Sequence, residues 1–208
     1  HVLTYDQEGV FPDSHILPDN YSLPAMAVEL QQILEAEKID QCHFIGHALG
    51  GHIGAELALI AIEKVKLQSL TLINAWDSLD PHTLKCFQTR VALLKNSSAE
   101  AYVRAQALFL YPPSYISKNI AQITQSENAA LPNFPPIENV LARLNALMQF
   151  KFTAQHRDAL QTVNLHIIAN KDDFLVPYQK SLDLQTFLGH GQLSIFETGA
   201  HASTVTET

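Results

Sequence analysis

The sequence predicts an α/β fold, in which a mostly parallel sheet is flanked by helices. Short apolar runs suited to buried strands alternate with segments whose apolar residues recur at helical spacing. Of the 208 residues, 47% are hydrophobic and 16% are charged, which is typical of a soluble globular protein with one sizeable core. No proline-rich or serine-rich linker divides the chain, so we expect one domain that carries an insertion.

The first part of the core is expected at residues 1–77. It opens with a predicted strand at Val2–Tyr5, and after an irregular loop Ser22 is a plausible N-cap for a helix that continues into the 30s. Three further elements are predicted from their apolar residues: a buried strand at Cys42–Ile45, a helix at Gly51–Ile62 and a buried strand at Leu70–Ile73.

A different pattern fills residues 78–160, where helical spacing dominates and little is typical of strands. We expect this segment to be a helical cap insertion, with helices around Leu84–Leu94, Ala99–Leu110 and Val140–Phe150. Strand character returns in residues 161–208, which form the second part of the predicted core. Its expected elements are strands at Val163–Ala169 and Leu193–Phe196 and a helix over Tyr178–Leu188.

Charge and composition exclude several classes of partner. The formal net charge is -8, with 13 basic and 21 acidic residues and no basic stripe for a phosphate backbone, so nucleic acid is not an expected partner. No apolar run approaches the roughly 20 residues that cross a membrane, and the N-terminal residues resemble no signal peptide. We therefore expect a cytoplasmic protein with a small-molecule substrate, and we leave a homodimer open. Cys42 and Cys86 are isolated thiols, best interpreted as small buried hydrophobes.

The most informative segment is Gly46-His47-Ala48-Leu49-Gly50. It has the form of a nucleophile elbow, G-x-S-x-G, with alanine in the position of the serine. Small residues at positions 46, 50 and 51 would let a strained strand-to-helix turn form without side-chain collisions. The same pattern also fits an ordinary glycine-rich connection, so other residues have to decide between the two.

Two polar residues follow predicted strands at the sheet edge where ligands gather in open α/β folds. Asp173 follows the strand at Val163–Ala169, and His201 follows the last strand. Positions 48, 173 and 201 have the chain order of a nucleophile, acid and histidine triad. Taken singly, Asp173 could cap a loop, His201 could lie on the surface, and the pair of Asp172 with Asp173 could simply be solvated.

Three further residues are pocket candidates: His47 beside the elbow, and Trp76 and Asp77 after the strand at Leu70–Ile73. Asp77 is also a second candidate acid, which we rank behind Asp173 and interpret as a cap-hinge residue. His43, His47 and His52 lie on a strand, a turn and a helix, so they share no face as a zinc pair on one helix does. We predict neither a metal nor a cofactor.

With these residues in place, the chain resembles the α/β-hydrolases, and specifically the hydrolases of the bacterial pyrimidine-utilisation (Rut) pathway. The resemblance runs along nearly the whole chain and is most specific in the cap. Besides the elbow, it rests on Tyr5-Asp6-Gln7 with Gly9, Met26-Ala27 with Glu29-Leu30, Cys86-Phe87-Gln88 with Arg90, Gln106 with Leu108-Phe109-Leu110-Tyr111-Pro112, Arg143-Leu144-Asn145-Ala146-Leu147, and Asp172-Asp173 with Leu175-Val176-Pro177. It implies hydrolysis of aminoacrylate or carbamate, and it implies that alanine at position 48 is typical of the family.

The resemblance also implies that the chain is truncated at both ends. The chain opens at what resembles the family's fourth strand and stops after His201-Ala202-Ser203-Thr204-Val205-Thr206, before the usual final helix. In that family the third strand lies between the fourth and the fifth, so without it the sheet would expose unpaired backbone edges. We therefore expect a fragment that lacks the N-terminal strands and the loop with one oxyanion donor, and whose activity is an open question.

Without a serine, no acyl-enzyme can form at Ala48. We therefore expect His201, oriented by Asp173, to activate water, with the Leu49 backbone N–H as one oxyanion donor. Two alternatives stay open: an enzyme on the same fold for another small substrate, such as a carbon–carbon hydrolase or cofactor-free oxygenase, and a non-catalytic scaffold that binds a ligand.

Overall fold

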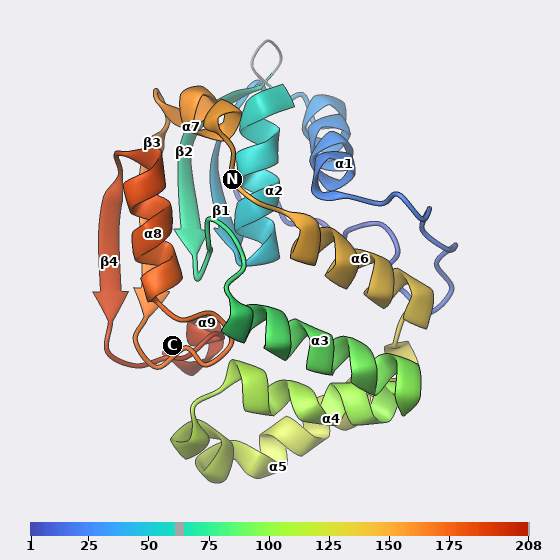
Figure 1. Cartoon of the computed structure of the whole chain (residues 1–208). Helices are drawn as coiled ribbons and strands as arrows, with labels where there is room; N and C mark the ends of the chain where they lie inside the picture. The colour runs from blue at the N-terminus through green and yellow to red at the C-terminus, as the bar shows by residue number, and fades with distance from the viewer. Residues whose placement is uncertain (61–64, 208) are drawn as a thin grey trace.

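A computed structural model describes residues 1–60 and 65–207. Four parallel strands form one sheet in the order β1-β2-β3-β4. Their bounds are Gln41–His47, Lys66–Ile73, Asn164–Asn170 and Gln192–Phe196. All four strands run in the same direction, so their carboxyl ends meet at one edge, near α9 in Figure 1. The predicted α/β class with a parallel sheet is confirmed.

Helices pack on the sheet through one main core. This core contains residues of α1 (Leu23–Ala36), α2 (Leu49–Ile60), α7 (Ala154–Leu160) and α8 (Gln179–Leu188). Figure 1 shows α2, α7 and α8 against the same face of the sheet, with α1 beside α2. The buried strand residues alternate along the two central strands, as the pleat requires, and include Leu70, Leu72, Leu165 and Ile167. Burial of this apolar face holds the strand ends that carry the site.

A second group of helices follows β2. It comprises α3 (Pro81–Asn96), α4 (Ala99–Leu110), α5 (Pro113–Ala130), the 3₁₀ turn η1 (Leu131–Asn133) and α6 (Ile137–Gln149). Their apolar residues form a second cluster, which also includes Trp76, Leu175 and Val176 from loops at the sheet edge. In Figure 1 α3, α4 and α5 lie beyond the carboxyl ends of the strands, and α6 lies to the side, between α1 and α3. We call α3 to α6, with η1, the cap.

The chain crosses between the core and the cap at two neighbouring points. The backbone N–H of Phe152 donates a 2.8 Å hydrogen bond to the carbonyl oxygen of Asp77, so the outgoing and returning segments are joined. Helix α7 falls within the 78–160 range expected for the insertion, yet it packs against α2 and α8 of the core. The last helical turn, α9 (Ser203–Thr206), follows His201.

Three predictions from the sequence need correction. Val2–Tyr5 forms no strand, because no described strand lies beside it to accept its backbone hydrogen bonds. The strand predicted at Cys42–Ile45 forms within β1, but it is an edge strand rather than a buried one, and Ile45 is 71% exposed. Helix α2 begins at Leu49 rather than Gly51, and positions 61 and 62 of its predicted end lie outside the described residues.

The structure also bears on the two cysteines and on the predicted lack of a membrane span. Cys86 is buried, as predicted, whereas Cys42 is only half-buried on the edge strand. None of the helices in the described part of the chain combines the length and the apolar character needed to cross a membrane.

Candidate active site at the sheet edge

The turn between β1 and α2 has the backbone strain of an elbow. Ala48 has φ +46°, in the left-handed region that non-glycine residues rarely occupy. The turn is held in place because the N–H of Ala48 donates a 2.8 Å hydrogen bond to the carbonyl of Ile73, while His52 N–H donates to the carbonyl of Ala48. A strained residue that the surroundings hold this firmly is typical of a functional turn. The methyl group of Ala48 therefore stands where an elbow presents its nucleophile.

The glycines around the elbow have different roles. A Cβ atom at Gly46 would collide with the backbone of Gly50 and Gly51, so only glycine allows the strand to come this close to the helix. A Cβ atom at Gly50 would meet nothing within 4 Å. A Cβ atom at Gly51 would lie 2.9 Å from a methyl carbon of Leu72. The expectation that small residues are needed therefore applies to Gly46 and Gly51 but not to Gly50.

Two neighbouring strand ends supply the acid and the histidine. Asp173 lies after β3 and His201 after β4, and the Asp173 Oδ2 to His201 Nδ1 distance is 2.8 Å. Both residues are buried, with exposed fractions of 6% and 3%. The other carboxylate oxygen of Asp173 accepts a 2.9 Å hydrogen bond from the N–H of Val176, which fixes the carboxylate plane. With Nδ1–H donating to the carboxylate, Nε2 is the ring nitrogen left to accept a proton.

The loop that carries His201 is fixed by polar contacts. Asn74 Nδ2 donates a 2.8 Å hydrogen bond to the His201 carbonyl oxygen. The carboxylate of Asp172 accepts hydrogen bonds from the N–H groups of Gly199 and Ala200, at 3.3 and 2.8 Å. Asp172 is therefore not merely solvated, because it holds the strained turn before the histidine, in which Ala200 has φ +51°.

A second histidine lies against the first. His47 Nε2 donates a 2.7 Å hydrogen bond to the carbonyl oxygen of His201, and the two ring centroids are 4.8 Å apart. Burial, together with the nearby charge of His201, lowers the pKa of His47 to about 4. His47 is consequently neutral near pH 7, so it supports the His201 loop without adding a positive charge.

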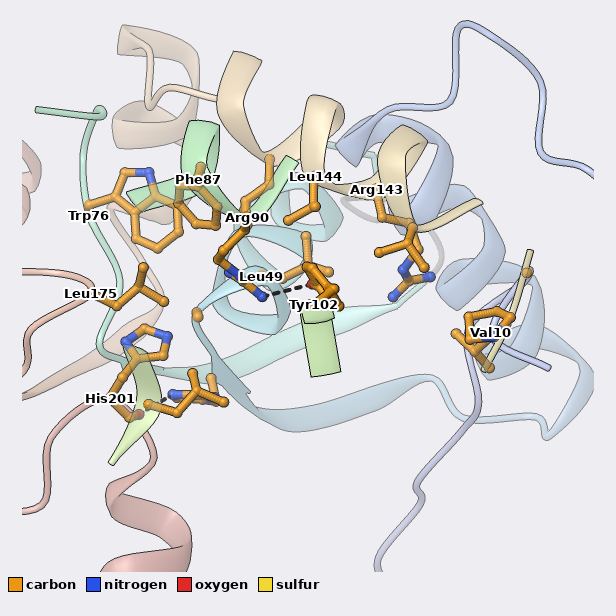
Figure 2. Close-up of a pocket in the computed structure, with 17 residues that line it drawn as sticks. Val10, Leu49, Trp76, Phe87, Arg90, Tyr102, Arg143, Leu144, Leu175 and His201 are labelled. Atoms are coloured by element: carbon orange, nitrogen blue, oxygen red, sulfur yellow. Dashed lines mark hydrogen bonds between the residues drawn. The ribbon is translucent and has the colours of Figure 1, made fainter. Parts of the chain in front are cut away.

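These residues surround a pocket of about 310 Å³ between the core and the cap (Figure 2). Five of the residues singled out in the sequence line it, namely His47, Ala48, Leu49, Trp76 and His201. Asp173 lies behind His201 rather than in the lining. Asp77 is also absent from the lining, and its carboxylate is 2.6 Å from Lys180 Nζ. Asp77 was predicted to line the pocket, but its side chain pairs with Lys180 and does not reach the lining.

Sequence reasoning missed the cap residues that face this pocket. Arg90 of α3, Tyr102 of α4 and Arg143 of α6 all line it. In the sequence, Arg90 and Arg143 stand out only within the motifs of the family resemblance. A sequence signal was present, because Arg90 occupies the apolar face of its helix, three residues after Phe87 and four before Leu94.

The three histidines weighed as metal ligands occupy separate places. His43 is exposed and bonds Ser69, His47 contacts His201, and His52 is buried against Trp76. Among residues 1–60 and 65–207, no group of three or more His, Cys, Asp or Glu side chains is arranged to hold a metal ion.

Comparison with known proteins agrees with this geometry. The sequence model of the alpha/beta hydrolase fold family matches residues 1–208. A relative from Acinetobacter baylyi, named "Putative carbamate hydrolase RutD", is 52% identical over the whole chain, which covers 78% of that relative. A relative of the same name from Pseudomonas syringae pv. syringae is 46% identical, with coverage of 100% of this chain and 78% of the relative.

Solved structures show the same fold at lower sequence identity. An alpha/beta hydrolase from a deep-sea metagenome library has a TM-score of 0.81 at 16% identity, covering 93% of this chain and 70% of that one. A hydrolase from Pseudomonas aeruginosa has a TM-score of 0.77 at 20% identity, covering 97% and 73%. The chain belongs to the α/β-hydrolase fold family and, within it, to the family of these RutD relatives.

Proposed function

We propose that this chain hydrolyses the carbon–nitrogen bond of carbamate or aminoacrylate, with water rather than a serine as the nucleophile. The observation that carries the proposal is the buried 2.8 Å contact between Asp173 and His201, placed beside an elbow whose nucleophile position is alanine. The RutD relatives are named for carbamate, and the sequence resemblance adds aminoacrylate.

In the proposed step, His201 Nε2 takes a proton from a water molecule in the pocket. Asp173 keeps the ring oriented and stabilises the positive charge that His201 acquires. With carbamate, the water oxygen bonds to the carboxyl carbon, the carbon–nitrogen bond breaks, and the proton leaves with the nitrogen as ammonia and bicarbonate form. With the imine tautomer of aminoacrylate, water adds to the imine carbon and loss of ammonia leaves an aldehyde.

The negative charge that develops on the attacked group has to be stabilised by a hydrogen-bond donor. We assign this part to the backbone N–H of Leu49, which lies in the first turn of α2, where N–H groups have no acceptor within the helix. General-base catalysis contributes about 10²- to 10⁴-fold, and one oxyanion donor about 10²- to 10³-fold. Such an acceleration suffices for a substrate that already decomposes unaided, but it is small for a stable amide.

The proposal is tested by following ammonia release from freshly prepared carbamate and aminoacrylate. We expect the protein to accelerate release from at least one of them over buffer, and the His201→Ala variant to lose about 10²- to 10⁴-fold of that rate. A matched control is His166→Ala, because His166 bonds Ser194 on the sheet and does not line the pocket.

Two results would reject the proposal. No acceleration with either substrate would favour the non-catalytic scaffold or an enzyme for another small molecule. Equal acceleration by the wild type and by a folded His201→Ala variant would separate the activity from the pair of Asp173 and His201.

A further inference from the structure

We propose that Arg90, held by Tyr102, binds a carboxylate group of the substrate from the cap side of the pocket. This inference rests on the proposed function for the identity of the substrate. The binding of a carboxylate, however, is measurable without turnover. It would make Arg90 a specificity-determining residue.

Arg90 is fixed in position but has hydrogen-bonding capacity left. Its Nη2 donates a 3.0 Å hydrogen bond to the hydroxyl oxygen of Tyr102. The guanidinium also lies over two aromatic rings, 5.3 Å from the Phe87 centroid and 5.6 Å from that of Tyr102. Its buried Nε atom has no hydrogen-bond partner among the described residues. Because a buried donor without a partner is costly, the guanidinium keeps hydrogen-bonding capacity that the described residues do not fill.

The charges around the pocket favour an anion there. Although the whole chain has a formal net charge of -8, no Asp or Glu is among the described residues that line the pocket. His47 is neutral near pH 7 because burial lowers its pKa to about 4. The lining therefore combines two guanidinium groups with mainly apolar neighbours, in which a charge-assisted hydrogen bond is stronger than in water.

The two pocket arginines are not equivalent. Arg143 donates through Nη1 to the carbonyl oxygen of Glu8 at 3.2 Å, and it interacts electrostatically with the Glu29 carboxylate. Neither arginine has a carboxylate within ion-pair distance in the described part of the chain. The difference is that Arg143 already donates to a backbone carbonyl and is acted on by the charge of Glu29, whereas the one polar contact of Arg90 with the described residues is the Tyr102 hydroxyl.

Arg104 on α4 shows what a structural arginine looks like in the same cap. Its guanidinium is on the surface and pairs with Glu100 and Glu127, at 2.9 and 3.2 Å. Arg90 instead turns its charge toward a cavity and meets aromatic faces and one hydroxyl (Figure 2). The planar guanidinium offers two parallel donors to a carboxylate, which an ammonium group cannot do.

The residue proposed to bind the carboxylate and the residue proposed to activate water come from different parts of the fold. Arg90 comes from the cap, whereas His201 comes from the sheet edge, and both line one pocket of about 310 Å³. This volume is near the lower end of the range for ligand pockets, about 300 to 1,000 Å³. The inferred ligand class is accordingly a short monocarboxylate whose anionic end contacts Arg90 while its reacting carbon approaches His201. Aminoacrylate fits this class, because its carboxylate is separate from the carbon that water attacks, whereas in carbamate the two coincide.

The experiment measures binding of propionate and of propionamide, a neutral molecule of the same shape, by calorimetry or NMR titration. We expect the wild type to bind propionate more tightly than propionamide. We expect Arg90→Gln to lose about 10- to 100-fold of the propionate affinity, with little change for propionamide. Arg90→Lys should lose less, and Tyr102→Phe should lose least because only the hydroxyl that positions Arg90 is removed.

Arg104→Gln is the matched control, since it removes the same charge from the cap surface and should leave propionate binding unchanged. Circular dichroism checks that each variant is folded; if Arg90→Gln does not fold, Arg90→Lys and Tyr102→Phe carry the test. Equal affinity of the wild type for propionate and propionamide, no binding of either, or undiminished propionate binding in the folded Arg90 variants would overturn the inference.

The outcome is separable from the proposed hydrolysis. If propionate binds through Arg90 but ammonia release is not accelerated, the carboxylate site stands and the proposed reaction fails. If hydrolysis is accelerated but Arg90→Lys and Arg90→Gln raise neither KM nor the inhibition constant of propionate, the reaction stands and this inference fails.

Discussion

The pocket has two walls that differ in charge and in origin. The core wall includes His47, Ala48, Leu49, Trp76 and His201, and the cap wall includes Phe87, Arg90, Tyr102 and Arg143. The core wall holds one histidine bonded to a buried carboxylate and a second that is neutral near pH 7, whereas the cap wall supplies two guanidinium groups.

This difference assigns different functions to the two walls, proton transfer to the core wall and substrate recognition to the cap wall. In the proposed mechanism the residues for proton transfer lie at the strand ends, and the residues proposed for recognition lie on helices of the cap. A protein built in this way could change its substrate through the cap while the Asp173 and His201 pair stays the same.

The largest effect is expected on the core wall from Asp173→Asn. The change removes the carboxylate that accepts the hydrogen bond from His201, so we expect ammonia release to slow by about 10²- to 10⁴-fold. The control is Asp183→Asn, which removes an exposed carboxylate of α8 whose ion pair with Lys180 is worth little. Equal rates for both folded variants would mean that the acid has no part in the reaction.

The neutral histidine of the core wall predicts a pH dependence of stability. The pKa of His47 is about 4 in the folded state and about 6.5 in the unfolded state. Between these values the unfolded chain binds a proton that the folded chain excludes. The contribution is therefore fully present above pH 6.5, is lost as the pH falls toward 4, and amounts to about 3 kcal/mol.

Urea unfolding at pH 7 and pH 4.5 measures this contribution. We expect His47→Gln to reduce the loss of stability between the two pH values, whereas the exposed His43→Gln should leave it unchanged. His52, whose pKa burial lowers to about 3, gives the same sign and remains in both variants. Identical pH dependence in the wild type and His47→Gln would show that His47 is not held neutral.

A smaller effect separates the two glycines of the elbow. Gly46→Ala should destabilise the protein by about 1–3 kcal/mol, because the new Cβ would collide with the backbone of Gly50 and Gly51. Gly50→Ala should be neutral or stabilising by up to about 1 kcal/mol, since it adds a helix-favouring residue in open space. Thermal unfolding measures the stability of the two variants. Equal destabilisation would contradict the close contact between Gly46 and the backbone of Gly50 and Gly51.

Much of the fold was predictable because burial imposes a regular pattern. The apolar runs that became β2 and β3 are central strands, and their alternating residues pack under helices. The exposure of Ile45 was not predictable, because an apolar run does not tell whether its strand has two neighbours or one. Helix α5 was missed since Ile123 is its only buried residue among those described, which leaves little periodicity to detect.

Some residues of the candidate site could likewise be predicted from the sequence, and others could not. Asp173 and His201 could be paired from the sequence because parallel strands bring their carboxyl ends to one edge. The contact between Arg90 and Tyr102 depends on how α3 and α4 pack, and no sheet geometry constrains that packing. The role of Asp172 could not be predicted either, because the N–H groups that donate to its carboxylate belong to Gly199 and Ala200, which are 27 and 28 residues away in the sequence.

The central claim is that water, and not the protein, attacks the substrate at an elbow that keeps its shape. The most direct measurement is the intact mass of the protein, quenched in acid during reaction with a small activated ester, for the wild type and for Ala48→Ser. We predict no adduct on the wild type, and a stoichiometric acyl adduct on the folded Ala48→Ser variant, because φ at position 48 already suits a nucleophile. An acyl adduct within the wild-type pocket, or none on folded Ala48→Ser, would contradict the account.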